Sequence, residues 1–120
     1  MTEPVKEIIE RRQQDGERLA AEASDLFQGF NEMMKYYYKP SALTRRDKEL
    51  IATAVSVAIR CVPCLAVHLK NAFDAGATRG QAIDAAAIGV EFGGGPSFVV
   101  VRENLLPMLD QIEAIQKAEK

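Results

Sequence analysis

The sequence predicts an all-helical protein that forms a single domain. The chain has 120 residues, of which 48% are hydrophobic, and this is enough to form the core of one domain. Aromatic residues make up 7% and Trp is absent, so Ala, Leu, Ile and Val provide most of the apolar side chains. That mixture favours helices over a sandwich of short strands. We therefore expect residues 1–120 to form one all-α domain.

The first expected helix carries a single apolar stripe and ends before the pair Lys39-Pro40. The stripe recurs at alternating steps of four and three residues, as one face of a helix does. Its members are Leu19, Ala23, Leu26, Phe30, Met33 and Tyr37.

The second expected helix starts after Thr44 and runs to about Arg60. Thr44 is a good capping residue, and Asp47 three positions later makes an approximate capping box. Its expected apolar face consists of Leu50, Ile51, Ala54, Val55 and Ala58. Glu49 belongs to a different, small and polar face, with Ala52, Thr53, Ser56 and Arg60. The local sequence alone places Glu49 in solvent, within a charged first turn.

Pro63 predicts a corner between two helices. Proline breaks a helix from inside but fits its first position, so Cys61-Val62-Pro63 indicates a tight turn and Cys64 falls in the first turn of a third helix. This helix is expected to continue to Gly76, a natural C-terminal stop.

Two more helices are expected after this stop. The fourth begins at Thr78, with Gln81 in the capping-box position, and is apolar nearly all round, which predicts burial in the core or against another subunit. Gly93 to Gly95 end it, and Pro96 can open the last helix. The segment from Phe98 to Val101 is strand-like, but its place after a Gly/Pro break favours helix.

Charge and hydropathy exclude several classes of function. The 15 basic and 17 acidic residues give a net charge of −2 without a basic block, so we expect no nucleic-acid partner. The first residues are charged and no long apolar run follows, so we expect no membrane association and a cytoplasmic location. In that compartment a cysteine pair is typical of catalysis, redox sensing or metal binding.

One motif carries chemistry, Cys61-x-x-Cys64-x-x-x-His68. By itself a CxxC pair is compatible with half a zinc site, a redox pair or chance. His68 lies one helical turn after Cys64 and could take its proton, while Cys61 lies within disulfide reach if the corner resembles other CxxC turns. A metal-binding module is the alternative, with Cys61, Cys64, His68 and possibly Glu49 around zinc.

The segment LTRRDKELIATAVSVAIRCVPCLAVHLKNAFDAGAT resembles the core of the carboxymuconolactone decarboxylase superfamily, in its alkylhydroperoxidase D-like (AhpD-like) branch. The pattern of that branch is a glutamate, eleven residues, CxxC, three residues and a histidine. Glu49, Cys61, Cys64 and His68 match all four positions. The resemblance covers roughly residues 41–100.

The resemblance implies an AhpD-like helical bundle of one repeat, in which the helices bearing Glu49 and His68 form an antiparallel pair. It also implies a peroxidase mechanism with these four residues as its catalytic set. Glu49 orients His68 or relays a proton to it, His68 deprotonates Cys64, and Cys64 attacks a hydroperoxide to give a sulfenic acid. Cys61 then closes a disulfide, which a dithiol or disulfide protein reductant must reduce. No cofactor or metal is implied.

The sequence departs from the resemblance in specific ways. Peroxidase members carry a second histidine between the cysteines, where this chain has Pro63. The decarboxylases lack the CxxC pair, so lactone decarboxylation is disfavoured. The alternatives within this fold are a general disulfide reductase or a redox-sensing accessory protein. Single-repeat members assemble as trimers or hexamers, and we expect a homo-oligomer here as well.

The order of attack is open to two arguments. Thioredoxin-like logic makes the first cysteine, Cys61, the exposed nucleophile, whereas the proximity of a base favours Cys64. We assign the attack to Cys64, because His68 four residues away is a more direct activator than a helix dipole.

Overall fold

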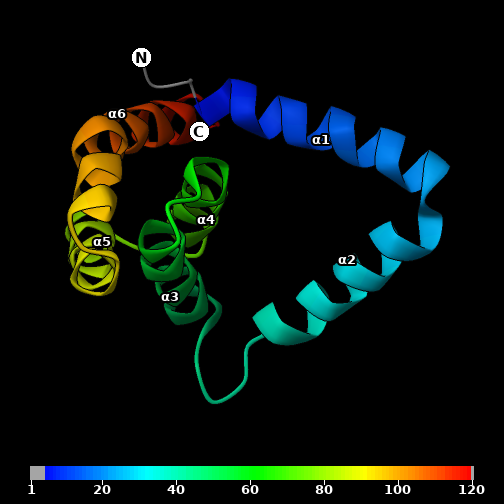
Figure 1. Ribbon diagram of the computed structural model, residues 1–120, viewed down its shortest axis with the longest axis horizontal. Helices are drawn as coiled ribbons and strands as arrows, with labels where there is room; N and C mark the ends of the chain where they lie inside the picture. Colours follow the sequence, from blue (N-terminus) through cyan, green and yellow to red (C-terminus); the bar gives the residue numbers. More distant parts are fainter. Residues whose placement is uncertain (1–4, 120) are drawn as a thin grey trace.

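The computed structural model describes residues 5–119 and contains six helices within that range. In chain order these are α1 (Val5–Glu22), α2 (Ser24–Tyr38), α3 (Arg45–Ala58), α4 (Val62–Asp74), α5 (Arg79–Gly93) and α6 (Gly95–Glu119) (Figure 1). The described residues include no β-strand. The predicted all-α class is therefore confirmed.

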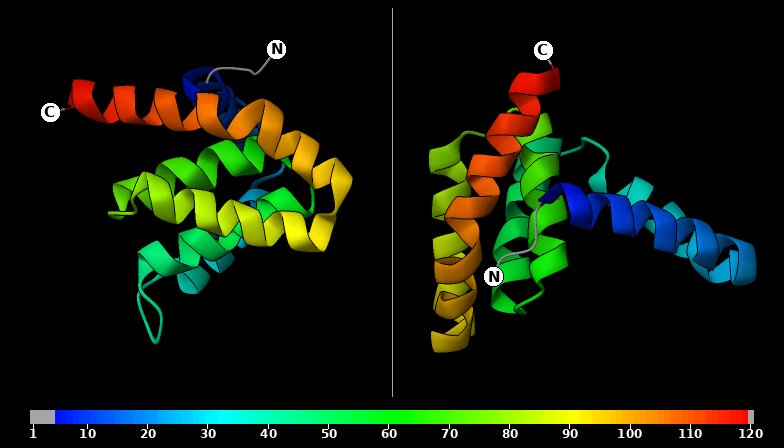
Figure 2. Two further views of the ribbon diagram at one scale, coloured as in Figure 1. Left: turned by 90° about the vertical axis from the view of Figure 1, so that its left-hand side faces the viewer. Right: turned by 90° about the horizontal axis from the view of Figure 1, so that it is seen from above.

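The helices divide into a body and an arm. In the body, α3 and α4 form the expected antiparallel pair, α5 packs along α3, and α6 packs on α5 and α4 (Figure 1). We call α1 and α2 the arm. Its two helices pack on each other and extend to one side of the body, as the view from above shows (Figure 2).

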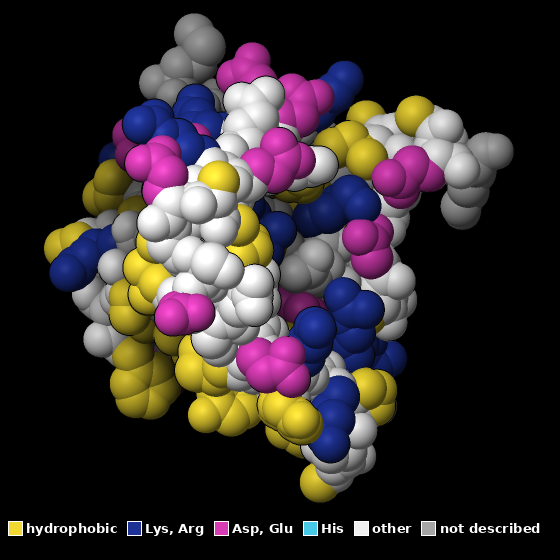
Figure 3. Space-filling model, turned by 90° about the vertical axis from the view of Figure 1, so that its right-hand side faces the viewer, with side chains coloured by type: hydrophobic (Ala, Val, Ile, Leu, Met, Phe, Trp, Pro, Cys, Tyr) yellow, Lys and Arg dark blue, Asp and Glu magenta, His cyan; other side chains and the backbone are white. Residues whose placement is uncertain are grey.

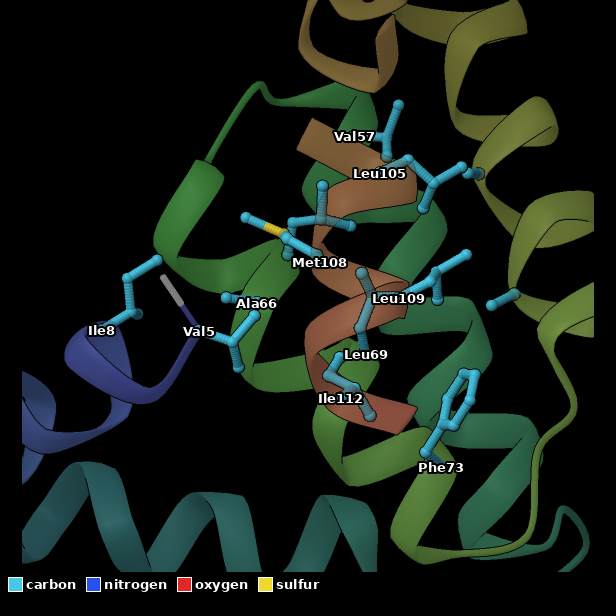
Figure 4. Close-up of a cluster of buried hydrophobic side chains, with 13 residues drawn as sticks. Val5, Ile8, Val57, Ala66, Leu69, Phe73, Leu105, Met108, Leu109 and Ile112 are labelled. Carbon is cyan, nitrogen blue, oxygen red and sulfur yellow. The ribbon is translucent and has the colours of Figure 1, made fainter. Parts of the chain in front are cut away.

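The hydrophobic core lies between α4 and α6 and is closed by the start of α1. Leu65 and Leu69 of α4 are fully buried, and Figure 4 shows Leu69 beside the α6 side chains. Val5 and Ile8 join them from α1, which ties the arm to the body. The α6 residues of this core are Leu105, Met108, Leu109 and Ile112.

The first expected helix is two helices, because the chain breaks at Ala23. This residue has φ −140° and ψ 61°, which is not a helical conformation. The predicted stripe does not face the body either: Leu26, Phe30 and Tyr37 are 66%, 56% and 64% exposed in the single chain. The four-and-three periodicity correctly indicated helix, but it could not show the break or what the stripe would pack against.

The corner between α3 and α4 is a Schellman-type helix end. The Cys61 N–H donates to the Ser56 carbonyl (3.0 Å) and the Arg60 N–H donates to the Val57 carbonyl (3.1 Å). These two bonds require a left-handed residue between helix and turn, and Arg60 takes this role with φ 60°. Cys61 thus ends one helix motif and caps the next.

The predicted caps and stops are confirmed where local sequence controls them. Thr44 accepts a hydrogen bond from the Asp47 N–H, and Thr78 and Gln81 form the full capping box of α5. Gly76, with φ 97°, follows α4, and the segment 98–101 is helical within α6. No helix among residues 5–119 has the length and apolar character needed to cross a membrane.

The expected burial of α5 holds on one side of the helix. Ala82, Ala86 and Gly89 are buried against the body. The larger apolar side chains Ile88 and Phe92 are 55% and 79% exposed in the single chain. Small residues, with Val90, therefore make the contact inside the chain, and Ile88 and Phe92 point away from it.

Candidate functional site

The inner face of α3 is polar and buried. Glu49, Thr53 and Ser56 are 2%, 0% and 2% exposed. The expectation from local sequence that Glu49 is solvated is wrong. The apolar face predicted for this helix is not the face that is buried within the chain. Ile51 and Val55 of that face are 53% and 50% exposed.

The two hydroxyl side chains of this face are satisfied within their own helix. The Thr53 hydroxyl donates to the Glu49 carbonyl (2.9 Å) and the Ser56 hydroxyl donates to the Ala52 carbonyl (2.7 Å). Such back-bonding leaves no unpaired polar atom when another helix packs against them. Small, satisfied side chains therefore let α4 and α5 approach α3 closely.

Glu49 and His68 meet across the α3–α4 pair. The Glu49 Oε1 atom lies 2.7 Å from the His68 Nδ1 atom, and the side chains are 3% and 16% exposed. A carboxylate is an acceptor, so this contact places a proton on Nδ1. Nε2 is then the ring nitrogen left to exchange a proton with another group.

Cys61 and Cys64 are joined in a disulfide, with their Cα atoms 5.2 Å apart. Cys61 is the N-cap of α4, and its Sγ atom accepts a hydrogen bond from the Cys64 N–H at 3.2 Å. Pro63 lies in the first turn, as expected from its sequence position. The structure thus supports the disulfide reach that the CxxC spacing predicts.

A cavity of about 380 Å³ opens beside the motif, between the arm and α4. Both Cys64 and His68 line it, whereas Cys61 does not. The walls are mostly apolar, with charged groups from α1. The lining side chains other than Cys64 and His68 are those of Ile8, Arg11, Arg12, Asp15, Phe30, Met34, Pro63, Val67 and Asn71.

Sequence reasoning missed Tyr38, the last residue of α2. Its ring stacks on the His68 imidazole, with centroids 5.7 Å apart and planes 15° from parallel. Burial raises the pKa of Tyr38 above its ordinary 10.0, and the negative charge of Glu49 raises it further. The sequence has three consecutive tyrosines, at 36–38, and nothing in that run shows which one faces the site.

The described residues do not contain a group of three or more His, Cys, Asp and Glu side chains arranged to hold a metal ion. Glu49, His68 and the two cysteines are thus brought to one region, but as a hydrogen-bonded pair next to a disulfide. The roles that the sequence predicts for these four residues stay predictions.

Together, these features define an all-helical protein with a disulfide-forming CxxC pair beside a buried Glu–His pair. Residues 24–103 match the carboxymuconolactone decarboxylase family. The chain belongs to this family, and the resemblance seen in the sequence is confirmed.

Two similar curated proteins are described as uncharacterized. One is uncharacterized protein 4 in the cox locus of Paracoccus denitrificans, 33% identical over 98 residues, which are 82% of this chain and 86% of that protein. Another, from Cupriavidus necator, is 39% identical over 74 residues, which are 62% of this chain and 63% of that protein.

Solved structures share the fold. A carboxymuconolactone decarboxylase family protein from Legionella pneumophila, solved in its apo form, has a TM-score of 0.79 at 27% identity and covers 92% of this chain and 95% of its own. A family member from Thermotoga maritima with a suggested part in the antioxidative response has a TM-score of 0.78 at 22% identity. That match covers 94% of this chain and 92% of its own. The second likeness shows the fold alone.

Proposed function

We propose that this protein is a thiol peroxidase that reduces organic hydroperoxides with its Cys61–Cys64 pair. The observation that carries the proposal is the Glu49–His68 contact of 2.7 Å, which leaves Nε2 for a second proton partner in a cavity that Cys64 also lines.

The first chemical step uses the reduced protein. His68 accepts the Cys64 thiol proton, and the carboxylate of Glu49 stabilises the imidazolium. The thiolate sulfur attacks one peroxide oxygen, so that an S–O bond forms and the O–O bond breaks. The leaving alkoxide takes the proton from His68 and departs as an alcohol, while Cys64 becomes a sulfenic acid.

The second step forms the disulfide present in the structure. The Cys61 sulfur attacks the Cys64 sulfur, the sulfenic oxygen leaves as water, and the S–S bond closes. A dithiol donor must then restore the pair: one donor thiolate attacks the disulfide, its second thiol resolves the mixed disulfide, and the donor leaves oxidised. This donor and the hydroperoxide are the proposed partners.

A general disulfide reductase is the second candidate, and one contact favours it. The Cys61 Sγ atom accepts an N–H bond at the start of α4, where a thiolate is stabilised by the helix dipole. In this reaction Cys61 attacks the disulfide of a substrate and Cys64 resolves it. The two candidates differ in which cysteine reacts first.

Cysteine variants test the proposal. Reduced wild type treated with one equivalent of cumene hydroperoxide should lose two free thiols without forming a covalent dimer. Cys64→Ser should not consume peroxide, and Cys61→Ser should stop at a sulfenic acid that dimedone traps on Cys64. Mass spectrometry of the labelled peptides gives the assignment.

Dimedone labelling of Cys64→Ser but not of Cys61→Ser would reverse the order of attack, with Cys61 as the residue that reacts with peroxide. Wild type that keeps both thiols in the presence of peroxide, yet reduces a model disulfide, would rule out the peroxidase. Covalent dimers on oxidation would contradict the resolving role of Cys61.

A further inference from the structure

Tyr38 covers one face of the imidazole that the proposed mechanism uses. Its ring lies nearly parallel to that of His68, at a centroid separation of 5.7 Å. The contact joins two distant segments, because Tyr38 ends α2 while His68 lies in the middle of α4. The α4 backbone and the Glu49 contact at Nδ1 restrain the imidazole from other directions.

The backbone next to Tyr38 is tied to the helix that carries Glu49. The Lys48 ammonium donates to the Lys39 carbonyl at 2.6 Å and to the Ser41 hydroxyl at 2.9 Å. Lys48 directly precedes Glu49 in α3, and Lys39 directly follows Tyr38. The segments that carry the aromatic ring and the carboxylate are thus connected through Lys48.

Charged groups line the hollows on both sides of this ring pair. His68 shares its cavity with Arg11, Arg12 and Asp15 of α1. Tyr38 and Glu49 line a second hollow of about 510 Å³, together with Arg12 of α1, Lys35 of α2, Lys39, and Arg45 of α3. The face on the side of the arm shows Lys and Arg side chains gathered beside a hollow (Figure 3). A phenol is neutral at pH 7 with its ordinary pKa of 10.0, and burial raises the pKa of Tyr38 further. A neutral electron-rich ring face attracts a cation such as imidazolium.

We propose that Tyr38 is a positioning residue for His68, whose ring stacking fixes the imidazole plane and favours the protonated imidazole that forms when Cys64 is deprotonated. The inference rests on the proposed function only in taking His68 as the base for Cys64. Tyr38 acts through its aromatic ring and not through its hydroxyl. A Phe side chain should therefore preserve the effect on His68, and an aliphatic side chain should lose it.

Alkylation of the reduced protein tests the role of Tyr38 without peroxide. The rate of Cys64 alkylation by iodoacetamide is measured against pH, with peptide mapping to separate it from Cys61. For Tyr38→Leu we expect a rate at pH 7 that is lower by roughly threefold to tenfold, the range that one aromatic contact supports, and a pH midpoint that moves upward. Tyr38→Phe should stay within about twofold of wild type.

The chain supplies a matched control in the preceding residue. Tyr37 is 64% exposed, and Tyr37→Leu removes the same side chain from the same helix. Its alkylation curve should coincide with that of wild type. Light scattering and circular dichroism confirm that all variants are compared in the same assembly and fold.

A spectroscopic measurement keeps the proposal testable if Tyr38→Leu does not fold. The chain has one histidine, so its ring protons give a single set of NMR signals. Wild type and Tyr38→Phe should both show cross-relaxation between the ring of residue 38 and His68. An absence of that contact in wild type would refute the stacking in solution.

The remaining outcomes separate the two proposals. A Tyr38→Leu curve with an unchanged midpoint and a uniformly lower rate would indicate a structural role alone and overturn the inference. A shifted midpoint in a protein that does not consume peroxide would uphold the role of Tyr38 and reject the peroxidase. If wild type consumes peroxide but the alkylation curves of Tyr38→Leu and wild type coincide, the peroxidase is upheld and the role of Tyr38 is rejected.

Discussion

The two faces of α3 are opposite to those of an ordinary amphipathic helix. On the inner face, Glu49, Thr53 and Ser56 are buried. On the outer face, Ile51 and Val55 are about half exposed, at 53% and 50%. A helix of a globular protein normally turns its apolar stripe to the core. Each face therefore needs a separate physical explanation.

The inner face is built for close approach. A Cβ atom at Gly89 of α5 would lie 2.3 Å from the Ala54 carbonyl oxygen and 2.7 Å from the Val57 Cβ atom, so only glycine fits this helix crossing. With α5 and α4 packed this closely, Glu49 is shielded from water and contacts His68.

The outer face exposes large apolar side chains. Further exposed apolar side chains lie on α5 and at the start of α6, namely Ile88, Phe92 and Phe98. Large exposed apolar surfaces mark interaction sites. We propose that another copy of the chain covers them, in keeping with the trimer or hexamer that the sequence predicts.

The largest expected effect comes from charging the outer face. The double variant Ile51→Lys/Val55→Lys should turn the predicted oligomer into a monomer, because two ammonium groups would be buried without partners at the interface. Light scattering at micromolar concentration measures this. Gln14→Lys, at an exposed position of α1, is the control and should assemble as wild type does. A wild type that is already monomeric would remove the basis for this prediction.

On the inner face, Glu49→Gln should lower the reactivity of Cys64. The amide keeps the shape of the side chain but no longer stabilises the imidazolium, so we expect alkylation at pH 7 to fall by up to about 100-fold, the low end of general acid–base effects. The same iodoacetamide assay with peptide mapping measures it. The control is Glu91→Gln at an exposed position of α5. Coincident curves for Glu49→Gln and wild type would leave Glu49 without a role in activating the thiol.

The smallest expected effect is on stability, from filling the helix crossing. Gly89→Ala should lower the free energy of unfolding by about 1–3 kcal/mol, because the new methyl group overlaps backbone that cannot move aside without separating α3 from α5. Urea unfolding measures the change. Gly29→Ala in α2 meets nothing within 4 Å and should instead gain up to about 1 kcal/mol. Equal stability of the two variants would show that the crossing is looser than described.

Local signals predicted the helix ends well. Thr44 and Thr78 cap their helices through hydrogen bonds to residues three positions away, and Pro63 fits the first turn of α4. These interactions involve neighbours in sequence, so the residues that make them can be seen without the fold. The family pattern likewise located Glu49 and the CxxC motif, where the local sequence favoured a solvated glutamate.

Burial was harder to predict, and α3 shows why. Periodicity separates the faces of a helix but does not state which one packs inside the protomer. The sequence groups Leu50, Ile51 and Val55 on one apolar face, which the hydrophobic effect within one chain alone would turn to the core. If a second copy covers the outer face, both faces of α3 are buried in the assembly. The sequence pattern alone then cannot show which face packs within the chain.

By itself, the sequence determined the helical class, the caps, the family and the four residues of the motif, because each depends on composition or on fixed short spacings. Tertiary structure decided the break at Ala23, the burial of Glu49 and the choice of Tyr38 among three adjacent tyrosines. The burial of Glu49 and the position of Tyr38 depend on how segments far apart in the chain pack together. The stacking of Tyr38 on His68 joins residues thirty positions apart, and no local pattern encodes such a contact.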